Sequence, residues 1–276
     1  APDGTYERIV VEAAVSDENA NDVVTVTIPE LGLEEQIKLE AGRGAIQIAC
    51  APELWSPDSP RLYRAVAHYK DDQVMDFVGF RRIAVNGGRL ELNGQPIFLR
   101  GISVHEDDFF HGKRSTEEDI RRRYAHAKEL GCNFVRLAHY PHSELAPKIA
   151  DRLGLLLWEE IPVYWAIDFA NPKTYADAEN QLLELIRRDR NRASVVIWSV
   201  GNENADTDER LAFMSSLAGV ARRTDPSRLV SAACLINHQS QRIEDRLEEY
   251  LDVIGVNEYY GWYIPSFQEW EAILAN

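Results

Sequence analysis

The sequence predicts a β-sandwich of immunoglobulin type over residues 1–88, followed by an α/β region over residues 89–276 that forms an incomplete (β/α)8 TIM barrel. Three observations predict this arrangement. Apolar residues up to about position 88 alternate with period two between turn residues, as in short strands. From about position 90 onward, apolar runs alternate with helix-like segments, as in a parallel sheet with crossover helices. Polar residues gather just after these runs, where a barrel places its active site.

The composition is that of a globular chain with an excess of acidic residues. Of its 276 residues, 45% are hydrophobic, which is ample for a sizeable core. The formal net charge of -15 argues against nucleic acid as a partner, because phosphate binding needs a basic surface. No apolar run approaches the ~20 residues of a membrane span, so we expect no membrane partner. The first residues carry no signal-peptide pattern, which favours a cytoplasmic location.

Sequence motifs for metals and cofactors are lacking. Cys50, Cys132 and Cys234 are widely spaced and odd in number, so they form neither a disulfide framework nor a zinc pattern. No pair of histidines has convincing metal-ligand spacing. Glycine-rich dinucleotide loops, P-loops and the Gly-x-Ser-x-Gly elbow are missing as well. We therefore expect no metal and no cofactor, and neither nucleotide binding nor serine hydrolysis.

The N-terminal strand candidates are short and evenly spaced. Proline and glycine separate them at positions 29, 32, 42, 44, 52, 57 and 60. The candidates cover residues 9–11, 23–28, 36–39, 45–48, 62–69 and 74–85. Because no cluster of titratable side chains converges in this region, we expect it to be structural.

The barrel region begins after a hairpin, since Asn93-Gly94 is a strong tight-turn signal. Six strand candidates follow, at residues 97–103, 134–137, 155–158, 195–200, 229–233 and 253–257. A closed barrel needs eight strands and typically about 250 residues, so this one is expected to stop short at its C-terminus. Its first and sixth strands would then have open edges, which invite association into a homo-oligomer.

Helices are predicted between these strands. The first opens with a capping box formed by Ser115 and Glu118 and runs to Gly131, and the second ends at Gly154. The next two have apolar faces, at positions 178, 182, 185 and 186 and at positions 211, 214, 218 and 221. A last helix is expected from Ser266 onward.

Polar side chains follow five of the six strand candidates, and we expect the strand starts to carry no such groups. The polar positions are residues 105–108 (His-Glu-Asp-Asp), Arg136, His139, Glu159, Glu160, Asn202, Glu203 and residues 257–263 (Asn-Glu-Tyr-Tyr-Gly-Trp-Tyr). Carboxylates, amides and histidines bind hydroxyl groups, and aromatic faces bind the apolar side of a pyranose ring. The pattern therefore favours a sugar site.

Several of these residues also allow a structural interpretation. Asn202 and Glu203 could instead cap the next helix. Arg136 could be a buried partner of Glu159 or Glu160, and the histidines could be satisfied core residues. For Asn202 and Glu203, the one-sided placement of the polar groups favours the site over the helix cap, whereas both interpretations of Arg136 stay open.

Taken together, the segments resemble glycoside hydrolase family 2, the family of β-glucuronidases, β-galactosidases and β-mannosidases. The similar segments are residues 54–63, 78–81, 92–96, 100–101, 136–141, 198–203 and 257–263. Residues 198–203 (Trp-Ser-Val-Gly-Asn-Glu) match the acid/base motif of the family. Residues 257–263 look most similar to the β-glucuronidase branch, whereas Ala138 stands where the family more often has Ser or Thr.

The resemblance implies a retaining exo-β-glycosidase that acts on β-glucuronides or β-galactosides. Glu203 would be the general acid/base, and Asn202 would hold the sugar 2-hydroxyl. The glycone pocket would be lined by Asp107, His139, Tyr259 and Tyr263. The nucleophile of the family, a Glu at the end of the seventh strand, would lie past position 276, so we expect a fragment that lacks it. The alternative is a non-catalytic carbohydrate-binding or scaffold fragment.

Overall fold

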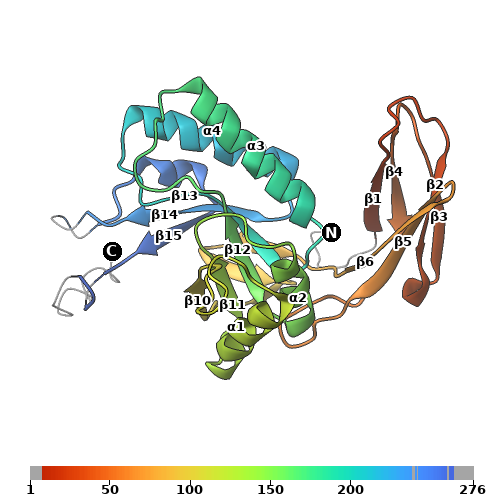
Figure 1. Cartoon of the computed structure of the whole chain (residues 1–276), viewed down its shortest axis with the longest axis horizontal. Coiled ribbons are helices and arrows are strands. Elements are labelled where there is room, and N and C mark those ends of the chain that lie inside the picture. The colour runs from red at the N-terminus through yellow and green to blue at the C-terminus, as the bar shows by residue number, and fades with distance from the viewer. Residues whose placement is uncertain (1–7, 238–239, 241, 260, 264–276) are drawn as a thin grey trace.

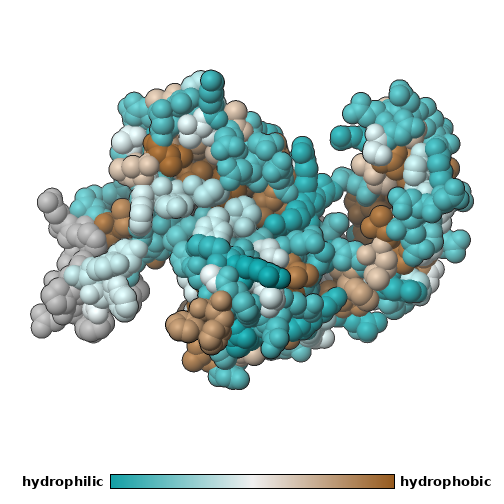
Figure 2. Space-filling model, in the orientation of Figure 1, coloured by the Kyte–Doolittle hydropathy of each residue, from teal (hydrophilic) through white to brown (hydrophobic). Residues whose placement is uncertain are grey.

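The computed structural model describes residues 8–237, 240, 242–259 and 261–263. In this part of the chain, antiparallel strands at the N-terminal end are followed by a parallel sheet with helices packed on it (Figure 1). Hydrophilic residues cover most of the face seen in Figure 2. None of the described helices is long and apolar enough to cross a membrane.

The first six strands form two antiparallel sheets, of which the larger has the order β3-β2-β5-β6 and the smaller pairs β1 with β4. Val24 and Ile37 of the larger sheet share a buried cluster with Val11 and Ile46 of the smaller one, so the sheets pack face to face. The elements are β1 (Arg8–Ala14), β2 (Val23–Ile28), η1 (Pro29–Leu31), β3 (Leu33–Lys38), β4 (Arg43–Ala49), β5 (Tyr63–Tyr69) and β6 (Asp72–Val78).

The strand expected over residues 74–85 is divided in two. β6 ends at Val78, and β7 (Ile83–Asn86) belongs to a separate small sheet with β8 (Arg89–Leu92) and β9 (Gln95–Pro96). The intervening chain crosses to the parallel sheet, where Arg81 donates to the backbone carbonyls of Ala193 and Ser227 at 3.0 and 2.9 Å. These long-range contacts, which a local apolar pattern does not encode, explain where the strand ends.

The parallel sheet contains the six predicted strands. They are β10 (Gly101–Val104), β11 (Phe134–Leu137), β12 (Leu156–Glu160), β13 (Val195–Asn202), β14 (Leu229–Leu235) and β15 (Val253–Asn257). They pair in sequence order, all parallel, as in part of a TIM barrel. β10 starts at Gly101 and not at Ile97, since the backbone N–H of Ile97 still donates to Leu90 O of β8 at 2.9 Å, next to the Asn93-Gly94 hairpin.

Helices connect the strands of this sheet. They are α1 (Glu117–Glu129), α2 (Leu145–Leu153), α3 (Pro172–Asp189) and α4 (Asp208–Thr224), with a 3-10 helix, η2 (Arg246–Tyr250), before β15. The predicted apolar faces of α3 and α4 are buried, as at Leu182 and Met214. The helix expected from Ser266 onward lies outside the described residues.

The capping box of α1 is shifted by one residue from its predicted place. It consists of Thr116 and Asp119, not of Ser115 and Glu118. The backbone N–H and the hydroxyl of Thr116 donate to Asp119 Oδ2 at 2.9 and 2.7 Å. Both pairs have the required spacing, but the carboxylate of Asp119 is also held by Arg122 at 2.7 Å, which favours the observed box.

Both faces of the parallel sheet are buried, which explains why its strands are continuous apolar runs. Leu157 and Trp198 belong to a cluster with the helices. Trp158 and Val196 belong to a second cluster on the inner face, where Trp55 from the segment after β4 joins them.

Buried polar residues also lie at the starts of strands. Arg192 and Ser194 precede β13, and Asp225 and Arg228 precede β14. Arg228 donates to the carbonyls of Val195 and Arg192 at 3.1 and 2.7 Å and to the Asp225 carboxylate at 2.8 Å. The expectation that the strand starts lack such groups is therefore wrong. These groups satisfy backbone acceptors and fix the amino ends of the strands.

Candidate active site

Side chains from four strands meet at the carboxyl end of the parallel sheet. Arg136 lies on β11, Glu160 on β12, Asn202 on β13 and Asn257 on β15. Asn202 Oδ1 accepts hydrogen bonds from Arg136 Nη2 at 2.6 Å and from Asn257 Nδ2 at 3.0 Å. On β14, which lies between these two strands, Asn202 is opposite the small Ala233 and Asn257 is opposite Leu235.

Glu160 is the centre of this network and is 1% exposed. It accepts from Arg136 Nε at 3.1 Å and Nη2 at 3.2 Å and from Trp158 Nε1 at 2.7 Å, and His139 Nδ1 lies 2.6 Å from its Oε1. Of the two partners considered for Arg136, the structure thus favours Glu160. With so many donors, the Glu160 charge is compensated inside the sheet.

Glu159 points to the opposite face, because successive residues of a strand alternate. Its side chain is buried, and neither carboxyl oxygen has a hydrogen-bond partner. Burial, and then the negative charge of Asp189 on α3, raise the pKa of Glu159 well above its usual value. The alternative in which Glu159 pairs with Arg136 is therefore wrong, and the raised pKa of Glu159 favours the neutral form of its carboxyl.

Glu203 follows β13 with a φ of 55°, a left-handed conformation that is uncommon for non-glycine residues and concentrates at functional sites. Its Oε1 accepts from Asn257 Nδ2 at 2.6 Å and from the Tyr259 hydroxyl, and its Oε2 accepts from Trp165 Nε1 at 3.0 Å. Burial raises the pKa of Glu203, but these hydrogen bonds outweigh burial and hold the pKa below its usual value. Burial and the bond to Glu203 raise the pKa of Tyr259 to about 12, so its phenol remains a donor.

The packing around Gly201, two residues before Glu203, leaves little room for a side chain. A Cβ on Gly201 would lie 2.3 Å from Met214 Cε and 2.7 Å from Asn204 Oδ1. The register of β13 shifts at this point, which brings Asn202 opposite Ala233. The shift therefore aims Asn202 at its partners on the neighbouring strands.

Neither Asn202 nor Glu203 caps the following helix. The N-cap of α4 is Thr207, whose hydroxyl accepts from the backbone N–H of Arg210 at 3.2 Å. The helix-cap interpretation of the Asn-Glu pair is therefore wrong, and both side chains are free for the network at the sheet end.

A cavity of about 350 Å³ opens beside this network. It is lined by Ser103, His105, Arg136, Ala138, His139, Val256, Asn257, Glu258 and Tyr259. His139 and Tyr259, two of the residues predicted to line the glycone pocket, both line this cavity, and Asn202 and Glu203 contact its wall through Asn257. Tyr263 packs its ring on that of Tyr259, with centroids 5.2 Å apart, and is 76% exposed.

Asp107 stands apart from the network around Glu203. Its carboxylate pairs with Lys113 at 3.1 Å, and Lys113 also donates to the Tyr140 hydroxyl at 3.3 Å. The ring centroids of Tyr140 and His105 lie 6.0 Å apart, and those of His105 and His139 lie 5.2 Å apart. Among the described residues, the Asp107 carboxylate is thus connected to the pocket lining through Lys113, Tyr140 and His105.

Sequence reasoning missed Trp165, which lies in the segment between β12 and α3 and binds Glu203 directly. Its neighbour Tyr164 contacts the His139 ring at 5.7 Å. The signal that could have found them is their position, because an aromatic pair follows Glu160 at the same sheet end as the other polar residues.

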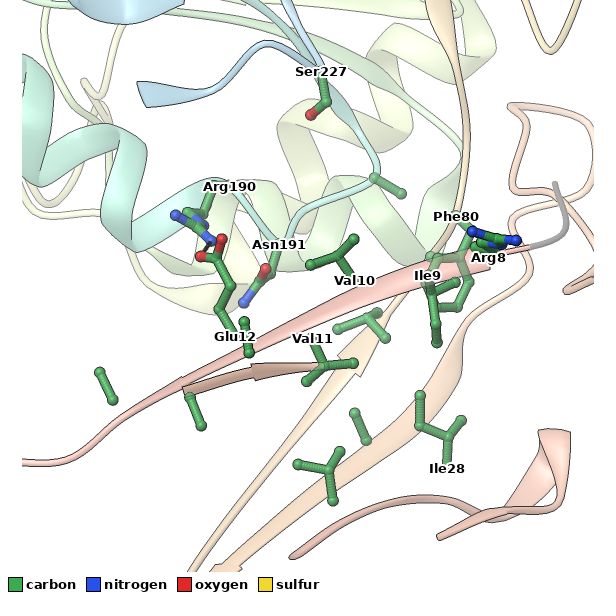
Figure 3. A pocket seen from close by; sticks show the side chains of 18 of the residues that line it. Arg8, Ile9, Val10, Val11, Glu12, Ile28, Phe80, Arg190, Asn191 and Ser227 are labelled. Carbon is green, nitrogen blue, oxygen red and sulfur yellow. Dashed lines mark hydrogen bonds and ion pairs between the residues drawn. The ribbon is translucent and has the colours of Figure 1, made fainter. Parts of the chain in front are cut away.

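Two other features could compete as functional sites. Asp108, His111 and Asp119 have metal-ligand spacing, but Arg122 donates to both carboxylates, at 2.8 and 2.7 Å, and supplies the cation itself. A larger groove, of about 1130 Å³, lies between β1 and the amino end of the sheet (Figure 3). The Arg190–Glu12 ion pair spans it, and it is formed at the sheet end opposite Glu203.

Comparisons with known proteins match this chain to a family. The model described as "Glycosyl hydrolases family 2, TIM barrel domain" matches residues 83–276. The chain is 32% identical over 238 residues to a beta-glucuronidase of Paenibacillus borealis, covering 80% of this chain and 39% of that protein. It is 33% identical over 193 residues to a beta-galactosidase of Enterobacter cloacae, covering 65% of this chain and 18% of that protein.

Solved structures give the same result for the fold. The crystal structure of a Bacteroides uniformis beta-glucuronidase superimposes with a TM-score of 0.80 at 28% identity, covering 98% of this chain and 38% of that chain. The chain therefore spans less than two fifths of the length of these relatives.

Proposed function

Because the chain belongs to glycoside hydrolase family 2, we propose that it supplies the acid/base half of the active site of a retaining exo-β-glycosidase, an enzyme that hydrolyses O-glycosyl bonds. The observation that carries this proposal is Glu203, a carboxyl at the carboxyl end of a barrel strand, held by three donors beside a sugar-sized pocket. β-Glucuronides are the first candidate substrates and β-galactosides the second, since relatives carry both names.

In this mechanism Glu203 gives its proton to the glycosidic oxygen as the C–O bond breaks and a second carboxylate attacks the anomeric carbon. Glu203 then takes a proton from the water that hydrolyses the glycosyl-enzyme. The second carboxylate must lie ~5–5.5 Å away. Glu160 is unsuited to this role because Arg136 and Trp158 occupy its oxygens. Glu258 is turned back onto the backbone N–H of Tyr259 at 2.8 Å. We therefore place the nucleophile outside the described residues.

The pocket residues have separate roles in the proposal. Asn202 accepts two hydrogen bonds at Oδ1, which leaves its Nδ2 to donate to the sugar 2-hydroxyl. His139 and Tyr259 line the glycone pocket, and the exposed ring of Tyr263 extends its wall. Asp107 would bind the sugar if sugar hydroxyls replaced its partner Lys113, whose side chain is 71% exposed.

We further propose that residues 1–88 form an immunoglobulin-like domain and residues 89–276 the catalytic barrel. Two antiparallel sheets with a shared core support the first part, and the match from residue 83 onward supports the second. Association into a homo-oligomer through the β10 and β15 edges is part of the same proposal. The alternative, a non-catalytic sugar-binding piece, is favoured for the 276-residue chain alone by the lowered pKa of Glu203, because an acid catalyst needs the protonated form.

The test is Glu203→Gln in a chain extended to the length of its relatives. Hydrolysis of an alkyl β-glucuronide, whose leaving group needs a proton, should fall by about 10²–10⁴-fold. For a 4-nitrophenyl glycoside, whose leaving group needs little protonation, Glu203→Gln should slow the step that breaks the glycosidic bond less. Glu209→Gln, an exposed change on α4, is the matched control and should retain full activity. Near-normal turnover of the alkyl glycoside by Glu203→Gln would overturn the assignment.

A further inference from the structure

We propose that Trp165 forms the leaving-group subsite of this active site. Its indole N–H positions the Glu203 carboxyl, and its exposed ring supports the aglycone, so planar apolar aglycones should be preferred. The inference rests on the proposed function and adds a residue and a ligand class to it.

The position of Trp165 relative to the pocket is the first argument. Oε1 of Glu203 binds Asn257 and Tyr259, which line the 350 Å³ cavity, whereas Oε2 binds Trp165, which does not line it. The carboxyl therefore stands between the cavity and the indole. If the sugar occupies the cavity and the glycosidic oxygen meets Glu203, the group leaving with that oxygen points toward Trp165.

The backbone of Trp165 is the second argument. Its φ is 55°, a conformation that is an outlier for a bulky aromatic residue. Its N–H donates to Asn202 O, and its carbonyl accepts from Asn204 Nδ2, both at 2.9 Å. The two residues flanking Glu203 thus hold Trp165 in this strained conformation. Such strain persists where the surroundings enforce it, typically at functional sites.

The exposure of the ring is the third argument. Trp165 is 63% exposed although its indole nitrogen is engaged, so the rest of the ring faces solvent. Tyr164 meets it edge-on at 5.6 Å and continues the aromatic surface to His139 at 5.7 Å. An open indole beside a catalytic carboxyl offers a stacking surface for a flat apolar group.

The hydrogen bonds also assign the proton of the general acid. Oε1 of Glu203 accepts two bonds and Oε2 accepts one, so the protonated form carries its hydrogen on Oε2. That oxygen is the one on the Trp165 side, where the leaving group departs. Trp165 is therefore a positioning residue, which fixes the oxygen that delivers the proton.

The positioning role can be tested on the 276-residue chain by ¹⁵N NMR of the indole N–H groups. Loss of one signal in Trp165→Phe identifies the Trp165 indole. In the unmodified chain this signal should shift as Glu203 titrates under acidic conditions, and the shift should vanish in Glu203→Gln. The indole of Trp55, which donates to the backbone carbonyl of Asp151 at 2.8 Å, should be unaffected by that change. A Trp165 signal that ignores Glu203→Gln would overturn the positioning role.

The aglycone role is tested by calorimetric binding of phenyl and methyl β-glucuronides and β-galactosides to the same chain. Phenyl glycosides should bind about 2- to 12-fold more tightly than methyl ones, the factor expected from ring stacking. Trp165→Ala should abolish this preference and Trp165→Phe should keep most of it. Phe98→Ala, an exposed aromatic change before β10, should leave it intact.

The outcomes separate the two proposals. If no glycoside binds, the proposed sugar site fails and the subsite fails with it. If methyl glycosides bind and the phenyl preference survives in Trp165→Ala, only the subsite is wrong. Melting curves show whether each variant is folded. If Trp165→Ala is not folded, Trp165→Leu, a bulky but non-aromatic change, takes its place, and a phenyl preference that survives in it overturns the subsite.

Discussion

The two ends of the parallel sheet use arginine in opposite ways. At the amino end, Arg81, Arg192 and Arg228 donate largely to backbone carbonyls and to buried carboxylates. At the carboxyl end, Arg136 donates only to side chains, those of Glu160, Asn202 and Asn257. The first pattern fixes the chain, whereas the second fixes the position of functional groups.

The difference shows that the arginines at the amino end of the sheet stabilise the fold, whereas the arginine at the carboxyl end positions functional side chains. A guanidinium bound to strand carbonyls cannot be released without exposing the strand start. The side chains at the carboxyl end bind one another, so one of them can give up a partner for a sugar hydroxyl. His139, whose side chain is 27% exposed, is accessible for such an exchange. Among the described residues from β10 onward, the non-glycine residues with positive φ are Trp165 and Glu203, and both lie at the carboxyl end.

The largest effect is expected at the amino end, from Arg228→Met. The change leaves Asp225 buried without its cation and removes donors from the carbonyls of Val195 and Arg192. Breaking such a buried pair should cost about 3–5 kcal/mol in urea unfolding. Arg187→Met, at an exposed position on α3, should cost less than about 0.5 kcal/mol. Equal losses for the two variants would show that the amino-end network is not structural.

A smaller effect is expected at the carboxyl end, from Gly201→Ala. The new methyl group would meet Met214 Cε at 2.3 Å, and overpacking of this kind costs about 1–3 kcal/mol. Gly219→Ala on α4 is the matched control, since its Cβ would meet only the flexible end of Arg223 at 3.1 Å. This control should be neutral or stabilising by about 0.5–1 kcal/mol. A Gly201→Ala variant as stable as the control would contradict the close approach.

Much of the fold could be predicted from the sequence because its signals are local. Apolar runs predicted the six parallel strands, and periodic faces predicted α3 and α4. The acid/base motif led to Glu203, and the structure joins it to Asn202, Asn257 and Tyr259 in one network. The catalytic roles of these residues stay predictions until the mutants are measured.

The errors came from choices that the apolar pattern and the motif spacing leave open. Two overlapping capping boxes have the same spacing, and Asp119 was selected by its bond to Arg122. Trp165 gave no motif because its role depends on a left-handed backbone held by Asn202. The pairing of Arg136 was left open between two neighbouring carboxylates, although strand alternation allows only one of them to face it.

The last and smallest effect on stability is expected from Glu159→Gln, which changes one of these two neighbouring carboxylates. The folded chain keeps Glu159 neutral because burial and Asp189 raise its pKa, while the unfolded chain titrates it near the ordinary value of 4.5. The carboxyl therefore favours the fold fully below that value, and the contribution is lost as pH rises toward the folded-state pKa. Urea unfolding should show Glu159→Gln more stable than the unmodified chain at pH 7, with the advantage shrinking toward pH 4. Glu209→Gln should show no such trend, because its side chain is exposed. A Glu159→Gln difference that does not change with pH would mean that Glu159 is ionised in the fold, and the two faces of β12 would then not differ as described.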